Sequence, residues 1–332
     1  MTFGRAIHGA LAVLAIVCGL GLAQESPPAS TNREPLNNAW FTGPVLAPSA
    51  ATLPRGHFLI EPYFYDVTLQ GQYDHNGARR SVPHENEVRS LTYMLYGLSD
   101  KVTVGLIPTG GFNTLSEGLS SSGVEPGDLT LDAQYRISQF HEGSWHPATA
   151  AVMQETLPTG KYDRLGDRTS NGLGSGAYTT TLGLYSQSYF WLPNGRILRA
   201  RFNVSQAFSQ EVRVQDASVY GTGAGFRGHA HPGRSTFVDV ASEYSLTRNW
   251  VLALDATYRY NANTRVNGYN YLGSAPAALE LNSGSGYAVG LAPAIEFNWK
   301  HNLGVLLGTY MIVAGRNTSA TITPVVAINF WR

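Results

Sequence analysis

Apolar and polar residues alternate one by one over many stretches of this chain. In 128–137, for example, Leu129 and Leu131 are interleaved with Thr130 and Asp132. Period-2 alternation over about 8–12 residues is typical of a β-strand with two different faces, and about 9–11 residues cross a membrane as a strand. The alternation is clearest in 128–137, 197–208, 250–260, 287–299 and 321–331. It is weaker in 57–69, 89–96, 102–108, 147–157, 177–188, 236–244 and 303–314.

These segments predict twelve strands joined by connections that alternate in length. The short connections are 97–101, 138–146, 189–196, 245–249 and 300–302, and the long ones are 70–88, 109–127, 158–176, 209–235 and 261–285. Outer-membrane barrels have an even number of antiparallel strands, short periplasmic turns and longer external loops. The pattern therefore predicts an all-β, transmembrane, antiparallel up-and-down barrel over 57–332. The last external loop, 315–319, is the one short exception.

Composition separates this prediction from a soluble β-sandwich, which would alternate in the same way. Charged residues make up 14% of the chain, against about 25% in a typical soluble domain. The outward face of a soluble sheet would carry more lysine and glutamate, whereas only three lysines occur in the chain. The formal net charge of zero also gives no basic surface for a nucleic acid. A barrel with lipid outside and a confined polar lumen fits better.

The N-terminus predicts export. Arg5 and His8 precede an apolar run from Ala10 to Leu22, which is too short for a bilayer that needs ~20 apolar residues. We expect residues 1–23 to be a signal peptide cleaved after Ala23. The only cysteine, Cys18, lies within it, so the mature chain has no thiol chemistry. Residues 24–56, rich in proline, are expected to be an irregular periplasmic segment or a plug in the lumen.

Charged residues on the polar faces of the strands are the first candidates for a functional site. Because an arginine facing lipid at the midplane costs about 2–4 kcal/mol, these side chains are expected to point into the lumen. They line a selectivity filter in one interpretation, and close the barrel by pairing with one another in the other. The candidates are Asp132, Arg136, Arg199, Arg201, Asp239, Glu243, Asp255, Arg259 and Glu296.

Tryptophans form a second pattern, because five of the six fall where predicted strands meet the short turns. Such a position is typical of an aromatic girdle at one membrane interface. The predicted girdle contains Trp145, Trp191, Trp250, Trp299 and Trp331.

Catalytic and metal-binding patterns are weak. No histidine stands in a strand with a serine suitably placed for a hydrolase, and the pair His229 and His231 has no evident third metal ligand. The glycine-rich stretches 171–176 and 221–228 do not open a helix after a strand, and we expect them to be mobile external loops. No catalytic residue, metal or cofactor is therefore predicted.

Several short motifs follow one another in an order that resembles a known family. They are Gly97 to Lys101 running into 102–108, Gly127-Asp128-Leu129 leading to Tyr135-Arg136, and 157–161 with the sequence LPTGK. Over roughly 55–332 the chain is similar to the "MetA-pathway of phenol degradation" family of outer-membrane proteins. The resemblance implies a barrel of about twelve strands that takes up small hydrophobic or aromatic compounds. It transfers no ligand residue, and Arg332 departs from the aromatic C-terminus that outer-membrane barrels usually have.

The sequence as a whole predicts a bacterial outer-membrane channel for passive uptake of a small solute. The alternative is a non-conducting structural or surface-interaction barrel with a salt-bridged lumen. Expected partners are outer-membrane lipid, the barrel-assembly machinery and the solute, with no nucleic acid, and the protein is expected to be a monomer.

Overall fold

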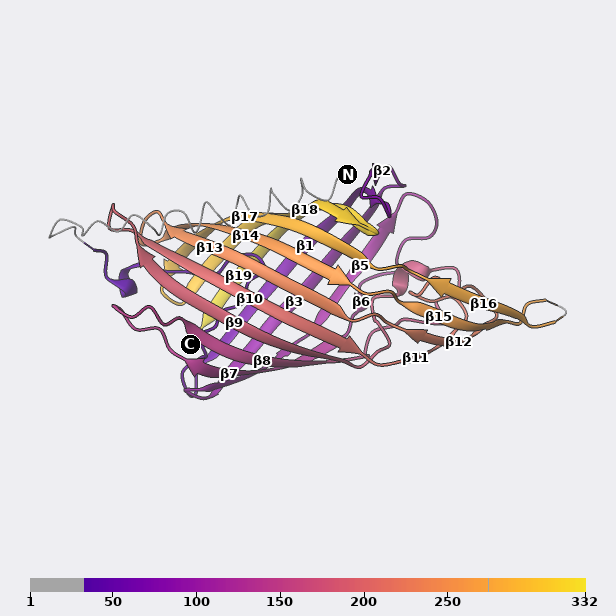
Figure 1. Cartoon of the computed structure of the whole chain (residues 1–332), viewed down its shortest axis with the longest axis horizontal. Helices are drawn as coiled ribbons and strands as arrows, with labels where there is room; N and C mark the ends of the chain where they lie inside the picture. Colours follow the sequence, from indigo (N-terminus) through magenta and orange to yellow (C-terminus); the bar gives the residue numbers. More distant parts are fainter. Residues whose placement is uncertain (1–32, 274) are drawn as a thin grey trace.

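A closed barrel of twelve antiparallel strands forms most of the molecule (Figure 1). The computed structural model describes residues 33–273 and 275–332, so the predicted signal peptide lies outside the described residues. The barrel closes because β1 pairs with β19 on one side and with β3 on the other. The twelve positions are occupied by β1 (Phe58–Tyr73), β3 (Glu85–Ser99), β4 (Val102–Ile107) continued by β5 (Thr109–Leu115), β7 (Leu129–Ser138), β8 (Ala148–Leu157), β9 (Thr179–Trp191), β10 (Ile197–Ser209), β13 (Ser235–Ser245), β14 (Trp250–Asn261), β17 (Gly286–Lys300), β18 (Leu303–Arg316) and β19 (Thr318–Trp331).

The predicted fold class and strand number are confirmed, and the strands differ from the prediction mainly in length. β1 and β3 continue several residues beyond the segments predicted at 57–69 and 89–96. The break between β4 and β5 falls at Pro108, which has no backbone N–H to donate, although its carbonyl still accepts from Thr92. Two short strands, β2 (Arg79–Arg80) and β6 (Glu125–Pro126), lie at the external rim.

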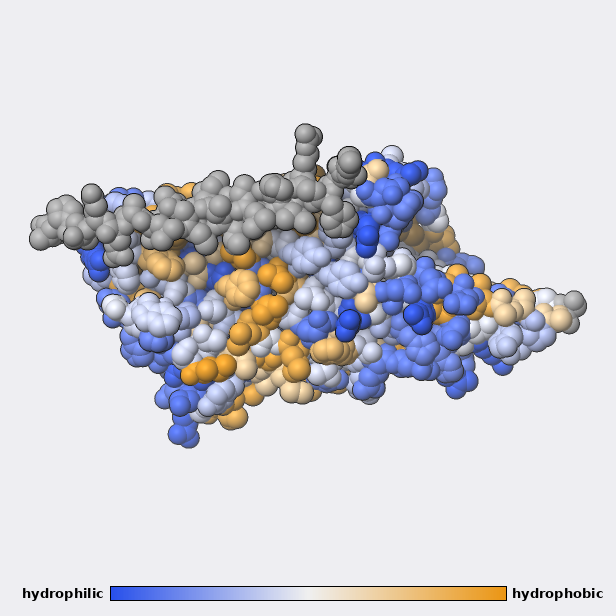
Figure 2. All heavy atoms as spheres, in the orientation of Figure 1, coloured by the Kyte–Doolittle hydropathy of each residue, from blue (hydrophilic) through white to orange (hydrophobic). Residues whose placement is uncertain are grey.

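The two faces of the barrel follow the alternation in the sequence. Phe64, Leu131, Phe202 and Leu252 point outward with 40–50% of their surface exposed, as expected of side chains that face lipid. Figure 2 shows apolar residues gathered over the barrel and hydrophilic residues toward its ends. The buried apolar core lies inside the lumen. It includes Val45, Tyr63, Ala292, Leu306, Val325 and Ala327.

A second, four-stranded sheet stands beyond the external end of the barrel (Figure 1). It consists of β11 (Val212–Gln215), β12 (Phe226–His231), β15 (Arg265–Asn270) and β16 (Ala277–Asn282). The long connections predicted at 209–235 and 261–285 therefore each contain two strands, and the last three residues of the glycine-rich stretch 221–228 belong to β12. Strands this short, with glycines at Gly228 and Gly268, give too little alternation to be recognised in sequence.

Within the part of the chain that the structure describes, helical structure is limited to two 3₁₀ turns, η1 (Leu36–Asn38) and η2 (Thr169–Asn171). Over the described residues, no helix is long and apolar enough to cross a membrane.

Candidate functional site

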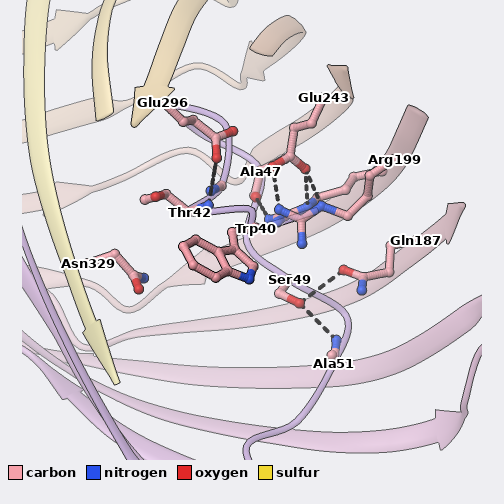
Figure 3. Close-up of polar contacts among 12 residues, drawn as sticks. Trp40, Thr42, Ala47, Ser49, Ala51, Gln187, Arg199, Glu243, Glu296 and Asn329 are labelled. Atoms are coloured by element: carbon pink, nitrogen blue, oxygen red, sulfur yellow. Dashed lines mark hydrogen bonds and ion pairs between the residues drawn. The ribbon is translucent and has the colours of Figure 1, made fainter. Parts of the chain in front are cut away.

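The N-terminal segment lies inside the barrel and crosses its lumen (Figure 3). We call residues 40–54 the lumen segment. It contains Pro44, Pro48 and Pro54, and a proline has no N–H to contribute to a sheet ladder. Its remaining backbone groups are buried and need partners, which come from lumen-facing side chains of the barrel. This placement favours the plug among the two interpretations of 24–56.

Asp255 on β14 holds the centre of the lumen segment. Its carboxylate accepts hydrogen bonds from three consecutive backbone N–H groups, those of Val45 at 2.9 Å, Leu46 at 3.3 Å and Ala47 at 3.1 Å. The side chain is fully buried. Hydrogen bonds to an ionised acceptor are about twice as strong as neutral ones, so this residue is the strongest single anchor of the segment.

Glu296 and Asn298 on β17 hold the start of the lumen segment. Figure 3 shows Glu296 beside Thr42. Glu296 accepts from the N–H groups of Thr42 at 2.6 Å and Gly43 at 3.2 Å. Asn298 accepts from the Thr42 hydroxyl at 2.9 Å and donates to the carbonyl of Trp40 at 3.1 Å. Five backbone N–H groups are thus bound by two buried carboxylates.

The second half of the segment is held by uncharged side chains and by one arginine. Gln187 on β9 accepts from both the hydroxyl of Ser49 and the N–H of Ala50, at 3.0 and 3.2 Å. Three side chains donate to backbone carbonyls of the segment: Arg201 donates to that of Ala47, Asn203 to that of Pro48 and Gln134 to that of Ser49. The hydroxyl of Thr103 accepts a hydrogen bond from the N–H of Leu53. The segment is therefore bound along its whole length.

Arg199 and Arg201 on β10 meet Glu243 on the neighbouring strand β13. Arg199 donates to both carboxylate oxygens of Glu243, one of them at 2.6 Å, and the Nε atom of Arg201 lies 3.1 Å from the same group. All three residues are buried. The Arg199 guanidinium also lies over the ring of Phe41, 4.4 Å from its centroid. The ion pairs are thus part of the wall that holds the lumen segment.

The other predicted charges are more dispersed. Asp239 is fully buried in the same wall, but neither of its oxygens has a hydrogen-bond partner among the described residues. Asp132 on β7 accepts from Gln154 at 2.8 Å on the opposite wall. Arg136 is half-buried near the periplasmic end of β7. Arg259 lies at the external end of β14, exposed to water and stacked over the ring of Phe237 at 4.4 Å.

The excess of carboxylates over guanidinium groups explains why this wall binds the backbone of the lumen segment. The buried lumen-facing positions of β10, β13, β14 and β17 carry two guanidinium groups against four carboxylates, those of Asp239, Glu243, Asp255 and Glu296. Among the described residues, Glu243 forms the ion pairs, Asp255 and Glu296 receive the N–H dipoles of the lumen segment, and Asp239 has neither kind of partner. Burial of an unpaired charge costs free energy, so these N–H groups stabilise the carboxylates of Asp255 and Glu296. We call this surface the charged wall.

Sequence reasoning missed several residues of the site. Glu61 on β1 is buried and accepts a hydrogen bond from Asn329 at 3.1 Å. The alternation of residues along 57–69 could have identified it as a lumen-facing charge. Gly304 and Gly308 on β18 make room for the lumen segment, since a Cβ atom at Gly308 would lie 2.8 Å from a methyl group of Val45. Gln187 and Thr103 were not identified either, because uncharged polar residues are common on every lumen face.

The tryptophans divide into two groups. Trp250 and Trp299 are about half exposed and point outward on either side of Phe297, and Trp145 is 83% exposed in a turn. The predicted outward orientation is wrong for Trp191 and Trp331. The indole of Trp191 donates to the carbonyl of Glu34, and Trp331 lines the lumen, because both residues fall on the inward parity of their strands.

A cavity of about 280 Å³ lies beside the lumen segment and reaches from Tyr93 on β3 to Arg199 and Arg201 on the charged wall. We call it the aromatic cavity. It is lined by Tyr63, Tyr93 and Tyr185 and by the aliphatic side chains of Leu59 and Leu95, with Asp132, Gln134 and Gln154 among the polar groups. An apolar cavity of about 150 Å³ is enough to bind benzene. The aromatic cavity is thus large enough for a single small aromatic molecule.

No convincing metal site accompanies this arrangement. His229 and His231 both approach Glu211, at 3.7 and 3.4 Å, on the external sheet. Within 33–273 and 275–332, however, no three His, Cys, Asp or Glu side chains are placed to hold a metal ion together.

The family comparison agrees with this fold and with the resemblance seen in the sequence. Residues 63–323 match the family described as "Putative MetA-pathway of phenol degradation". The chain belongs to this family. No curated protein matches the sequence significantly.

Solved structures with a similar fold are outer-membrane barrels. The COG4313 outer membrane channel from Pseudomonas putida F1 superposes with a TM-score of 0.65 at 15% identity, covering 87% of this chain and 100% of that one. The NanC porin has a TM-score of 0.41 at 12% identity, covering 81% and 98% of the two chains. A mutant of the TodX monoaromatic hydrocarbon channel has a TM-score of 0.34 at 11% identity, covering 84% and 90%. The COG4313 channel shares its fold with this chain, whereas the other two structures are too distant to support a further conclusion.

Proposed function

We propose that this protein is an outer-membrane channel for passive uptake of a small hydrophobic or aromatic solute. The observation that carries the proposal is the aromatic cavity, which lies in the lumen beside the lumen segment and is lined by three tyrosine rings and two leucines. Ligand sites for small molecules are mostly apolar, with a few polar groups that set orientation. Asp132, Gln134 and Gln154 supply such groups here.

The distribution of charge supports an uncharged solute. The ion pairs of Arg199 and Arg201 with Glu243 are buried, and Asp255 and Glu296 are occupied by backbone N–H groups. The free space borders Arg199 and Arg201, whose charges are already paired with Glu243. The carboxyl groups that line it are hydrogen-bonded as well, Glu61 with Asn329 and Asp132 with Gln154.

The lumen segment controls access in this proposal. It crosses the barrel and binds both walls, so that a solute reaching the aromatic cavity from outside requires the segment to shift. The segment is attached to the charged wall by a few hydrogen bonds that can break and re-form. The barrel strands are joined by continuous backbone hydrogen bonding, so the segment is the part that would move.

A second candidate function is a non-conducting barrel with structural or surface-interaction roles. It is favoured by the same occupied lumen, because buried ion pairs and a bound plug also describe a closed cylinder. The two functions differ in what happens when the plug is removed.

Planar-bilayer conductance tests the proposal on two proteins, the mature chain 24–332 and the chain lacking 24–56. A channel predicts small, infrequent steps for the mature chain and large, stable unitary steps after the deletion. Silence from both proteins, with barrel folding verified by heat-modifiable electrophoretic mobility, would contradict the channel and leave the non-conducting barrel.

A further inference from the structure

The external sheet is an extension of the charged wall beyond the membrane. Its strand order, β11–β12–β15–β16, repeats the order β10–β13–β14–β17 of the barrel strands to which these four strands are connected. Only a few residues separate each external strand from its barrel strand. In Figure 1 the sheet continues from the same side of the barrel and projects past its rim. Its position is therefore just outside the lipid-facing surface formed by side chains such as Phe202 and Leu252.

The two faces of this sheet differ sharply in chemistry. One face packs Val212, Val214, Phe226, Ala230 and Val266 into a core that also includes Ala177 and is flanked by Tyr162 and Tyr220. Tyr220 donates to the carbonyl of Ser175, and burial raises the pKa of Tyr220 to about 12. The opposite face is exposed and basic. We define the basic face by Arg213, Arg227, His229, His231 and Arg265.

Strand register brings these side chains together. Arg213 stands directly opposite His229, and His231 stands opposite Arg265. Directly opposed side chains on an antiparallel pair have Cβ atoms about 4.5–5.5 Å apart. Arg227 lies opposite Tyr269 and also contacts the ring of Tyr271 at 5.6 Å from its centroid. The five basic side chains thus form a compact patch.

The patch has few negative partners of its own. Glu211 lies near both histidines, and Glu280 on β16 is exposed on the same face, opposite Asn267. In the part of the chain that the structure describes, no carboxylate lies within ion-pair distance of Arg213, Arg227 or Arg265. Three arginines without an ion-pair partner on one exposed face favour the binding of an anion.

Two half-exposed tyrosines accompany the arginines. Tyr269 and Tyr271 are 52% and 50% exposed. Tyrosine is enriched at membrane–water interfaces, where its ring meets the headgroup region. Arginine matches the geometry of phosphate oxygens with two parallel hydrogen bonds.

We propose that the basic face binds the phosphorylated saccharide headgroups of the outer-leaflet glycolipid, lipopolysaccharide, next to the barrel. Charge complementarity and the position of the sheet just beyond the rim of the barrel select this partner. Each arginine near an anionic lipid surface contributes about a fivefold gain in binding, so three arginines together contribute on the order of a hundredfold.

The test measures binding of purified lipopolysaccharide to the full mature protein in detergent, with the same lipopolysaccharide after enzymatic removal of its phosphates as a second probe. The variant is R213Q/R227Q/R265Q, which keeps the size and hydrogen-bonding capacity of each side chain. The matched control is R79Q/R80Q/R168Q, which removes three exposed external arginines outside the patch. Heat-modifiable mobility verifies that all three proteins contain a folded barrel.

The proposal predicts that the patch variant binds phosphorylated lipopolysaccharide on the order of a hundredfold more weakly, while the control triple variant stays within about threefold of the wild type. It also predicts that the wild-type protein loses most of its affinity when the phosphates are removed. Equal binding by the patch variant and the control would overturn the proposal. Equally tight binding of a soluble acidic polysaccharide without lipid would also overturn it, because the face would then serve a free polysaccharide.

Discussion

Replacing Asp255 by alanine should release the lumen segment from the charged wall. The carboxylate accepts from the N–H groups of Val45, Leu46 and Ala47, and no other described acceptor is bound to these three donors. The substitution removes all three hydrogen bonds at once and leaves the barrel ladder intact, because the backbone of residue 255 remains paired with β13 and β17.

The size of the effect follows from the type of bond. A hydrogen bond to a charged group contributes about 1.5–3 kcal/mol, so three contribute about 4–9 kcal/mol. Water can reach the released N–H groups once the segment moves, and we therefore use the lower end. About 4 kcal/mol corresponds to a shift of roughly a thousandfold in the equilibrium between docked and undocked segment.

Planar-bilayer conductance provides the assay, with Asp239→Ala as the matched control. Asp239 is equally buried, belongs to the same wall and makes no hydrogen bond to the lumen segment. We expect Asp255→Ala to show frequent large openings that resemble those of the deletion of 24–56. Asp255→Asn keeps one acceptor oxygen for Leu46 and Ala47, and should lie between the wild type and the alanine variant.

The reasoning would be refuted by equal conductance of Asp255→Ala and Asp239→Ala when both proteins are folded. Such a result would mean that the lumen segment is held by packing of residues such as Val45, and not by the carboxylate.

Three further predictions concern a disulfide that fixes the lumen segment, the buried ion pairs of Glu243 and the contact of tryptophans with lipid. Cysteines at Thr42 and Asn298, whose side chains are 2.9 Å apart, should form a disulfide that abolishes large openings until a reductant is added; openings in the oxidised protein would contradict a moving segment. Glu243→Ala leaves two buried guanidinium groups unpaired and should lower the free energy of unfolding in urea by about 3–5 kcal/mol, whereas a loss below 1 kcal/mol would show that the pairs contribute little. Trp250→Phe should reduce quenching of intrinsic fluorescence by brominated lipid, and Trp191→Phe should leave the quenching nearly unchanged.

The fold could be predicted from the sequence because lipid and lumen impose opposite requirements on alternate residues. In β7 and β14 the apolar residues face outward and Asp132 and Asp255 face inward, as the alternation indicates. The family resemblance was also visible, in the order of short turn motifs. The meeting of Arg199 and Arg201 with Glu243 followed from the adjacency of two strands.

The role of the charged residues could not be predicted in the same way. The partners of Asp255 and Glu296 are backbone N–H groups of an irregular segment more than 200 residues away in the chain, and such contacts leave no pattern in side-chain chemistry. The inward orientation of Trp331 was not predicted because its position near a turn suggested the membrane interface. Its alternation with Phe330 along the strand places it on the lumen side. The signal peptide, the assembly machinery and the monomeric state stay predictions.

The most direct test of the central claim is the initial rate of uptake of radiolabelled phenol by intact cells that express the wild type, Leu95→Arg or Leu98→Arg. Leu95 lines the aromatic cavity, whereas Leu98 is on the same strand and points outward near the periplasmic turn, where an arginine costs little. We expect uptake to fall to the level of cells without the protein for Leu95→Arg and to stay near the wild type for Leu98→Arg. Equal uptake by both variants and the wild type would show that phenol does not pass through the aromatic cavity.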